Sequence, residues 1–424
     1  MRNMSRKIVF ILPALLFLAV VPKGFGQSYQ VFHSELNMIK ESAKWHLGPL
    51  RFYPLFRMRD IGYDDNVYRQ RELDDPVSDF TATLSPEINA YLLFRDSMIL
   101  SFMERPEYGF FSSQKRERRW NNTFSPQIKM LLFHRFVFSA GYDYSNRRHR
   151  ASSEIDVRAN VKTKAYTGRI LYESARRTSF GFSGRIEEDR YEDITLPGEE
   201  IYLSRRLNRD EQTGNFEFYY RIFSESFFTL RASYSDYTFQ SEEFSWRDSY
   251  SYQFLSGIQF PLLGRIRGNF SLGYKRLEPR DQERDGFSGL IADTRMDMRL
   301  GRVNLRFRYN RDCFFSYWTN NVFYNDNIYG GGVSVYLTQF LRLDYDLTHW
   351  RSRYPAPIPE VQPDGSVVDI LRRDRAFNHS TGLVFRIVQD FGVGFKVNFW
   401  KRSSNYTVVN RKNWFVGADL TYDF

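Results

Sequence analysis

Cysteine is almost missing from this sequence: Cys313 is the only one among 424 residues. A single thiol cannot form an intramolecular disulfide, so disulfides do not hold this fold together. Long apolar runs are missing too, because no stretch after the N-terminus approaches the roughly 18 apolar residues that suggest a transmembrane helix. The sequence therefore excludes a disulfide-stapled domain and predicts no transmembrane helix in the remainder of the chain.

Patterns that carry catalysis or metal binding are also lacking. The histidines show no paired spacing of the kind that binds zinc. His379 and Ser380 are adjacent, and adjacent strand residues face opposite ways, so they cannot form the Ser–His arrangement of a barrel phospholipase. Gly330-Gly331-Gly332 is interpreted as a bend in a strand and not as a phosphate loop. We expect no enzyme activity, no metal, no cofactor and no nucleic-acid partner.

Aromatic residues are abundant, with 40 Phe and 28 Tyr, although the mean hydropathy is −0.52. Transmembrane β-barrels reconcile these two properties, because a polar lumen face is combined with a lipid face bordered by aromatic girdles. The composition therefore favours a membrane barrel over an ordinary hydrophobic membrane protein.

The N-terminus has the pattern of a secretory signal peptide. Arg2, Arg6 and Lys7 form a positive region, residues 8–21 an apolar core, and Gly24-Phe25-Gly26 a small-residue cleavage site. A membrane anchor is the alternative, but the apolar core is short for a span. We predict a cleavable signal peptide over 1–26, a short periplasmic segment over 27–50 with a weak helical pattern, and a barrel over 51–424.

Segments of alternating polarity fill the region 51–424. They predict about eighteen strands (16–18), since side chains along a strand alternate between two faces. Their connections alternate between short and long, the long ones being 65–78, 112–117, 148–157, 192–207, 240–248, 278–286, 316–325, 353–374 and 405–410. The pattern predicts an all-β, transmembrane, antiparallel up-and-down barrel with short periplasmic turns and longer extracellular loops. A soluble sandwich would need a second sheet to cover the apolar face.

The last predicted strand shows the two faces clearly, because Trp414, Val416, Leu420 and Tyr422 alternate with polar or small residues and Phe424 ends the chain. This stretch resembles the terminal strand of bacterial outer-membrane barrels. The resemblance implies that Tyr422 and Phe424 are part of a signal read by the barrel-assembly machinery.

A barrel of this size leaves an aqueous channel. The lead-in segment is too short to be a plug, so an open pore is the default expectation. The long loop 353–374 is the candidate for an inward constriction, and an ordinary surface loop is the alternative.

Basic residues dominate the face predicted to line the pore. Rings of Arg and Lys favour anions, which predicts a passive conduit for anionic solute. Alternatively, these residues pair laterally with acids such as Glu187, Glu217, Asp297, Asp344 and Asp346 and merely hydrate the wall. The basic candidates are Arg169, Arg185, Arg221, Arg231, Arg267, Lys275, Arg295, Arg299, Arg306, Arg308, Arg342 and Lys396.

The region 51–93 contains Gly62-Tyr63-Asp64-Asp65-Asn66-Val67-Tyr68, Ser78-Asp79-Phe80 and Leu84-Ser85-Pro86-Glu87-Ile88. Together these stretches resemble the β-barrel porin family found beside exopolysaccharide synthesis and export genes. The acidic run is interpreted as turn chemistry, with calcium binding as the alternative.

The resemblance implies an outer-membrane channel, surrounded by outer-membrane lipid and lipopolysaccharide, through which a secreted polysaccharide leaves. Periplasmic polysaccharide-export proteins are then the expected partners. Two alternatives stay open: a general diffusion porin, and a non-conducting structural or adhesive barrel that presents the loops 192–207, 278–286 and 353–374.

Overall fold

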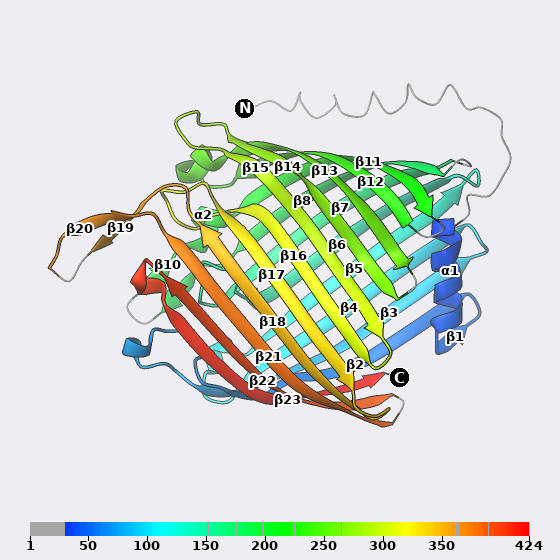
Figure 1. Cartoon of the computed structure of the whole chain (residues 1–424), viewed down its shortest axis with the longest axis horizontal. Helices are drawn as coiled ribbons and strands as arrows, with labels where there is room; N and C mark the ends of the chain where they lie inside the picture. Colours follow the sequence, from blue (N-terminus) through cyan, green and yellow to red (C-terminus); the bar gives the residue numbers. More distant parts are fainter. Residues whose placement is uncertain are drawn as a thin grey trace.

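A computed structural model describes residues 30–423 except 151, 175–176, 197–198, 224–225, 264, 362–363 and 389. The predicted signal peptide and Phe424 lie outside the described residues. The strands form a closed antiparallel barrel of eighteen long strands (Figure 1), so the predicted fold is confirmed. They are β2 (Leu50–Asp64), β3 (Asp79–Phe94), β4 (Met98–Phe111), β5 (Arg119–Leu132), β6 (Phe136–His149), β7 (Ala159–Glu173), β8 (Thr178–Tyr191), β11 (Arg209–Phe223), β12 (Ser226–Phe239), β13 (Ser249–Leu263), β14 (Ile266–Pro279), β15 (Phe287–Leu300), β16 (Val303–Phe315), β17 (Phe323–Tyr336), β18 (Leu341–Arg353), β21 (Arg373–Val388), β22 (Phe391–Ser404) and β23 (Arg411–Asp423).

Smaller elements that the sequence pattern did not predict lie within the connections. Two hairpins extend the loops, and short helices cap others. They are β1 (Trp45–Leu47), which adds to β2, the hairpin of β9 (Ile194–Leu196) and β10 (Glu199–Ile201), the hairpin of β19 (Ile358–Val361) and β20 (Val367–Ile370), α2 (Leu203–Leu207), η3 (Glu72–Asp74), η4 (Lys115–Glu117), η5 (Glu242–Arg247) and η6 (Thr407–Val409).

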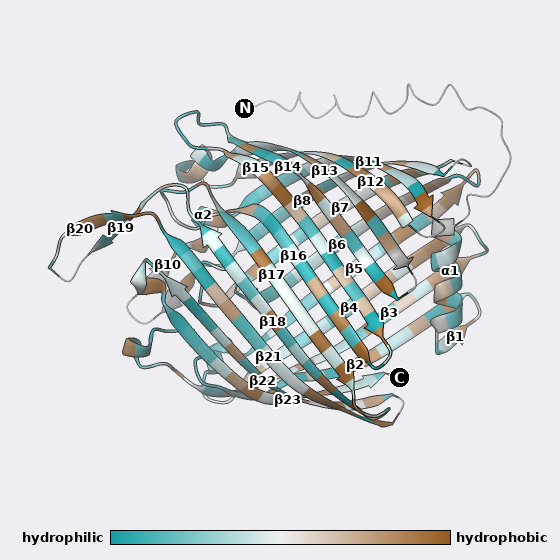
Figure 2. Ribbon diagram, viewed as in Figure 1, coloured by the Kyte–Doolittle hydropathy of each residue, from teal (hydrophilic) through white to brown (hydrophobic). Residues whose placement is uncertain are grey.

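Hydrophilic and hydrophobic residues follow one another along the long strands (Figure 2). In β22, Phe395 and Val397 are exposed on the outer face, whereas Lys396 between them forms ion pairs on the inner face. This alternation has the period of two that a strand imposes. The outer face is apolar and exposed, as a lipid-facing wall requires.

The connections gather by length at the two ends of the barrel, which we call the turn end and the loop end. At the turn end, Phe133 and His134 join β5 to β6 with φ angles of 51° and 58°. Two successive positive φ angles are those of a type I′ turn, which matches the twist of a tight hairpin. The long connections lie at the loop end (Figure 1).

The barrel closes where β2 meets β23. Their pairing runs from Leu55 opposite Asp423 to Asp64 opposite Phe415, with a register shift between Met58 and Ile61. The N–H of Asp60, within this shift, donates to the Asp419 carboxylate at 2.8 Å. Lys396 Nζ lies 2.8 Å from both carboxylates and so bridges the seam.

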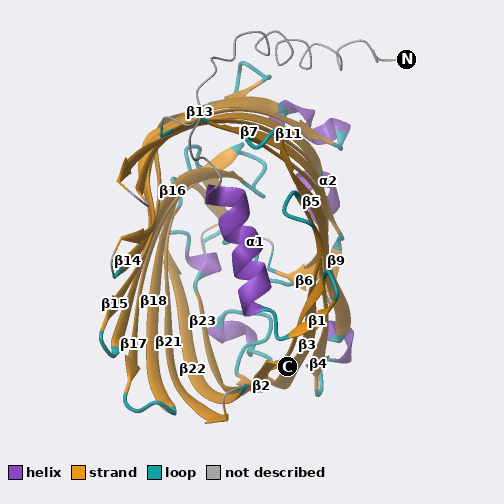
Figure 3. Ribbon diagram, turned by 90° about the vertical axis from the view of Figure 1, so that its right-hand side faces the viewer, coloured by secondary structure: helices purple, strands orange, loops and turns teal. Residues whose placement is uncertain are grey.

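Helix α1 (Gln30–Ser42) lies inside the rim at the turn end (Figure 3). Phe32, Leu36 and Ile39 repeat at helical spacing, and they pack against inner-face residues of β3–β7, which are Leu93, Ile99, Leu131, Val137 and Leu171. The segment 27–50 was predicted as a short periplasmic lead-in with a weak helical pattern, and its helix α1 lies inside the barrel rim. No helix among the described residues is long and apolar enough to span a membrane.

Candidate functional site

The strand register places all twelve predicted basic residues on the inner face. Thr167 on β7 pairs with Arg185, which pairs with Thr213, and Glu217 pairs with Arg231. The same register continues through Arg267 opposite Asp297 and Asp297 opposite Arg306. Because directly opposed residues share a face, the inner face can be followed from strand to strand around the wall.

Half of these basic residues form close ion pairs with carboxylates, as expected if they pair laterally with acids on the wall. Four pairs are Arg169 with Glu217 at 2.7 Å, Lys275 with Asp312 at 2.8 Å, Arg306 with Asp346 at 3.0 Å and Arg342 with Asp344 at 2.9 Å. Arg185 pairs with Glu187, and Lys396 with Asp60 and Asp419. These six contribute little free positive charge to the lumen.

The other six are less neutralised. Arg231 lies 3.7 Å from Glu217, which Arg169 already engages, and Arg295 lies 4.0 Å from Asp293 with its side chain 76% exposed. Among the described residues, no carboxylate lies within 4.0 Å of Arg221, Arg267, Arg299 or Arg308. We call the five arginines on β14–β16 the inner basic patch: Arg267, Arg295, Arg299, Arg306 and Arg308.

Glycines on β17 make room for two of these arginines. Gly330 is opposite Arg308, and Gly332 is opposite Arg306. A Cβ atom on either glycine would collide with the arginine side chain beside it. The guanidinium of Arg306 therefore crosses β17 to reach Asp346 on β18, and that of Arg308 reaches Thr348. The glycine run, expected as a bend, serves to let these side chains lie flat on the wall.

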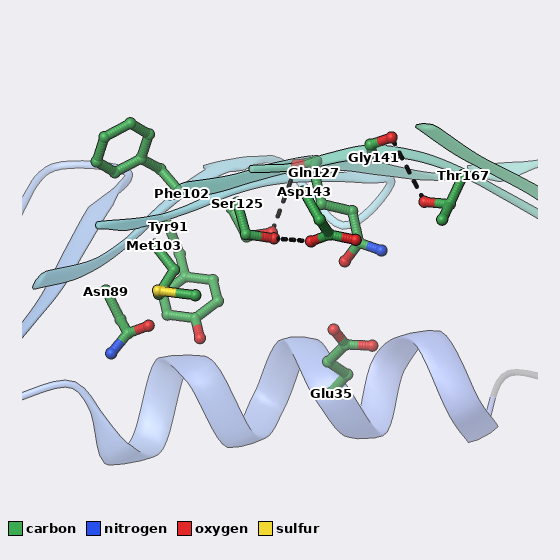
Figure 4. Close-up of a pocket in the computed structure, with 11 residues that line it drawn as sticks. Glu35, Asn89, Tyr91, Phe102, Met103, Ser125, Gln127, Gly141, Asp143 and Thr167 are labelled. Carbon is green, nitrogen blue, oxygen red and sulfur yellow. Dashed lines mark hydrogen bonds between the residues drawn. The ribbon is translucent and has the colours of Figure 1, made fainter. Parts of the chain in front are cut away.

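Helix α1 leaves a polar space beside the wall (Figure 4). A hollow of about 210 Å³ separates the helix from β3–β7, and Glu35 faces it from the helix. Lys129 Nζ lies 2.5 Å from the Glu35 carboxylate, and the Tyr53 hydroxyl donates to the Ile39 carbonyl at 2.6 Å. Lys44, beyond the helix, binds Asp390 at 2.6 Å. The helix is thus tied to two parts of the rim.

The loop end of the lumen is covered by a segment that crosses it. Residues 152–158, the crossing loop, connect β6 to β7. The buried Glu154 carboxylate accepts from Ser316 Oγ and from the Tyr317 N–H, both at 2.7 Å. Between β7 and β16 lie six strands, and between β6 and β17 lie eight by the other route. The contact therefore joins nearly opposite walls of the barrel.

Other loops pack around the crossing loop. Arg402 donates to the Ser153 carbonyl at 2.8 Å, and the fully buried Arg247 donates to the carbonyls of Ser316 and Trp318 at 2.6 and 2.8 Å. Buried aromatic and aliphatic residues fill the spaces, including Tyr354 and Ile358. We call this assembly the loop layer: the crossing loop, 202–208, 242–248, 316–322, 354–358, 371–372 and 405–410.

Only the base of the loop predicted to constrict the pore packs into the loop layer, through Tyr354, Ile358 and Arg372. The hairpin of β19 and β20 projects away from the barrel (Figure 1), and Val367 is 62% exposed. The inward segment is instead the shorter crossing loop. The length of the crossing loop does not predict that it folds inward, because the inward fold depends on contacts with residues more than 150 positions away.

Protonation of Glu154 should favour the packed loop layer. Burial raises the pKa of Glu154, although Arg372 and the hydrogen bonds to the carboxylate oppose the shift. A carboxyl with a raised folded-state pKa stabilises the packed state at low pH, and this contribution is lost as pH rises through the raised pKa. The charged or titratable groups around it are Arg372, Arg247, Tyr324, Tyr354 and Asp326.

We therefore expect ion conductance to fall as pH is lowered from 7 to about 4, near the ordinary pKa of Glu. Glu154→Gln, which mimics the protonated form, should hold conductance low throughout this range. Single-channel recording in a planar bilayer measures both effects. An unchanged pH response in Glu154→Gln would show that another group is responsible.

The acidic run on the first loop is engaged in hydrogen bonds within the fold. Asp64 Oδ1 accepts from the N–H of Asn66 at 3.0 Å, and Asp65 Oδ1 accepts from the N–H of Trp414 at 2.7 Å. Asn413 donates to both carboxylates. These bonds fix the first loop to the last strand, in keeping with turn chemistry. No cluster of three or more metal-binding side chains occurs in the described part of the chain.

No protein-family model and no curated protein matches the sequence. Solved structures with a similar shape include OpdQ from Pseudomonas aeruginosa (8% identity, 89% of this chain and 98% of that chain, TM-score 0.47). Another is OpdO from the same species (12% identity, 88% of this chain and 97% of that chain, TM-score 0.46). The siderophore receptor PirA from Pseudomonas aeruginosa is also similar (8% identity, 90% of this chain and 81% of that chain, TM-score 0.45). At these identities the likeness is one of fold alone.

Proposed function

We propose that this protein is an outer-membrane channel that passes anionic solutes through a basic lumen, with the loop layer as its constriction. The apolar outer face of the eighteen-strand barrel suits a lipid bilayer, and the predicted signal peptide would direct the chain out of the cytoplasm. In this orientation the turn end faces the periplasm and the loop end faces the cell exterior.

The observation that carries the anion preference is the exposed arginine set on β14 and β15. On the inner wall, Arg267 and Arg299 have no carboxylate within 4.0 Å among the described residues, and Arg295 has one only at 4.0 Å, from Asp293. Charge on a pore wall concentrates counter-ions, and arginine rings favour anions. Passage of a polysaccharide and contact with periplasmic export proteins stay predictions from the sequence, because the lumen chemistry fits any anion.

The test is reversal potential in a planar bilayer under a KCl gradient. The wild type should prefer chloride, and Arg267→Gln with Arg295→Gln and Arg299→Gln should move the reversal potential most of the way to that of an unselective pore. A matched control removes three arginines from the outer face: Arg351→Gln with Arg353→Gln and Arg375→Gln. This control should behave as wild type, since its charges do not face the ion path.

Two results would contradict the proposal. Cation preference in the wild type would reject the basic conduit. Absence of any conductance from a folded barrel, recognised by its heat-modifiable migration on gels, would favour the structural or adhesive alternative.

A further inference from the structure

A row of cations lies on the outer wall near the loop end. Its members are exposed residues of β16, β18, β21 and β22, and we call them the outer basic patch: Arg311, Arg351, Arg353, Arg373, Arg375 and Lys401. Each strand of the barrel directs its outer face toward the surroundings, so these six side chains lie outside the lumen and outside the ion path.

The strand register places like charges directly opposite one another. Arg351 is opposite Arg375, and Arg353 is opposite Arg373, on the adjacent strands β18 and β21. Asn327 lies between Arg311 and Arg351. Directly opposed side chains have Cβ atoms roughly 5 Å apart, and like charges in such pairs are destabilising. The barrel thus keeps two repelling pairs at one place on its surface.

The described part of the chain does not neutralise this patch. Within the described residues, no carboxylate lies within 4.0 Å of any of its six members. Buried cations nearby do find carboxylates: Arg402 on β22 pairs with Asp156, and Arg372, which precedes β21, pairs with Asp374. The outer basic patch has no such partner within the described residues, although its members oppose one another in pairs, and this indicates a ligand from outside.

The position of the patch identifies the class of that ligand. A row of aromatic side chains runs beside the patch on the side toward the turn end, with His349 4.6 Å from Phe377 and Phe399 4.4 Å from Trp414 between ring centres. Aromatic residues of barrels gather at the membrane–water interface. Two residues further along β18 and β21, at Arg351 and Arg375, the wall reaches the level of lipid headgroups. Arginine binds phosphate bidentately.

We propose that the outer basic patch binds a phosphorylated lipid headgroup of the outer leaflet, of the class that lipid A provides. The phosphates screen the opposed arginines on β18 and β21. The inference rests on the membrane-spanning barrel of the proposed function but not on ion conduction.

Native mass spectrometry of the full-length, detergent-solubilised protein tests this site with bisphosphorylated lipid A as the probe. Arg351→Gln with Arg353→Gln and Arg375→Gln should weaken binding by roughly a hundredfold, at about 1 kcal/mol for each basic residue near a lipid surface. The inner triple, Arg267→Gln with Arg295→Gln and Arg299→Gln, carries the same charge change and should bind as wild type. Lipid A without its phosphates should bind weakly to the wild type and to both triple variants.

Stability gives a second readout. Without anionic lipid the outer triple should resist urea better than wild type, because the repelling pairs are gone. With lipid A the order should reverse, since a ligand stabilises the protein that binds it.

Equal lipid A binding by wild type and outer triple would overturn the inference, as would an equal loss in the inner triple. Displacement of lipid A by an equal concentration of inorganic phosphate would overturn the lipid assignment. The channel proposal is tested separately, because it predicts a changed reversal potential in the inner triple and would fail if that potential stayed as in the wild type.

Discussion

Replacing residues 152–156 of the crossing loop with a short Gly-Ser linker is expected to raise single-channel conductance severalfold. This segment holds Ser153 and Glu154, which join the β6–β7 side of the barrel to Ser316, Tyr317 and Arg402 on other walls. Without these contacts the loop no longer spans the opening. Barrels of this strand number are wide enough for an aqueous channel, so the freed lumen should conduct.

The control puts the same linker in another long loop. It replaces residues 362–366, between β19 and β20, whose hairpin projects away from the barrel (Figure 1). Its conductance should equal that of wild type. If the crossing-loop variant conducts no better than this control, the narrowest point lies elsewhere, with α1 at the turn end as the remaining obstruction.

Arg372→Ala is expected to lower the stability of the loop layer by about 3–5 kcal/mol, the usual cost of removing one partner of a buried ion pair. Arg372 is fully buried and pairs with Asp374 at 2.6 Å. Its guanidinium also lies 4.6 Å from the Tyr354 ring centre and 5.4 Å from that of Trp318. Alanine would leave Asp374 charged, buried and without this partner.

Arg373→Ala provides the matched control, because it changes the neighbouring residue on the exposed face. It removes one charge of the repelling pair with Arg353, so it should not lower stability. Exposed substitutions usually change stability by less than about 0.5 kcal/mol. Urea unfolding in phospholipid vesicles, followed by tryptophan fluorescence and by protease cleavage of the loops, measures both. Equal stability of the two variants would mean that Arg372 does not hold the layer together.

The strands could be predicted from the sequence because their signal is local. Alternation in β16, β18 and β22 assigns each residue to a face without knowledge of its neighbours. The same alternation placed Arg267, Arg299 and the other basic candidates on one face, and the strand register agrees. The register between neighbouring strands decides which of these residues pair with acids. The alternation within a single strand says little about that register.

The inward segments were missed for a different reason. The spacing of Phe32, Leu36 and Ile39 was available as a helical signal, yet its partners are spread over β3–β7. Glu154 resembles any loop carboxylate until Ser316 and Tyr317 approach it from the far wall. Contacts this distant in sequence leave no periodic trace, so the loop layer and the position of α1 required the structure.

The pairing of β2 with β23 has a consequence for how the barrel assembles. Its hydrogen bonds join residues as distant in sequence as Leu55 and Asp423, so closure carries a high contact order and comes late. Until β23 pairs with it, the edge of β2 over residues 55–64 is open to any other strand. A circular permutant that links 423 to 50 and opens the chain between β11 and β12 would lose β1 but keep every pair between the eighteen long strands. It would place the unpaired edges of the partly folded barrel on different strands.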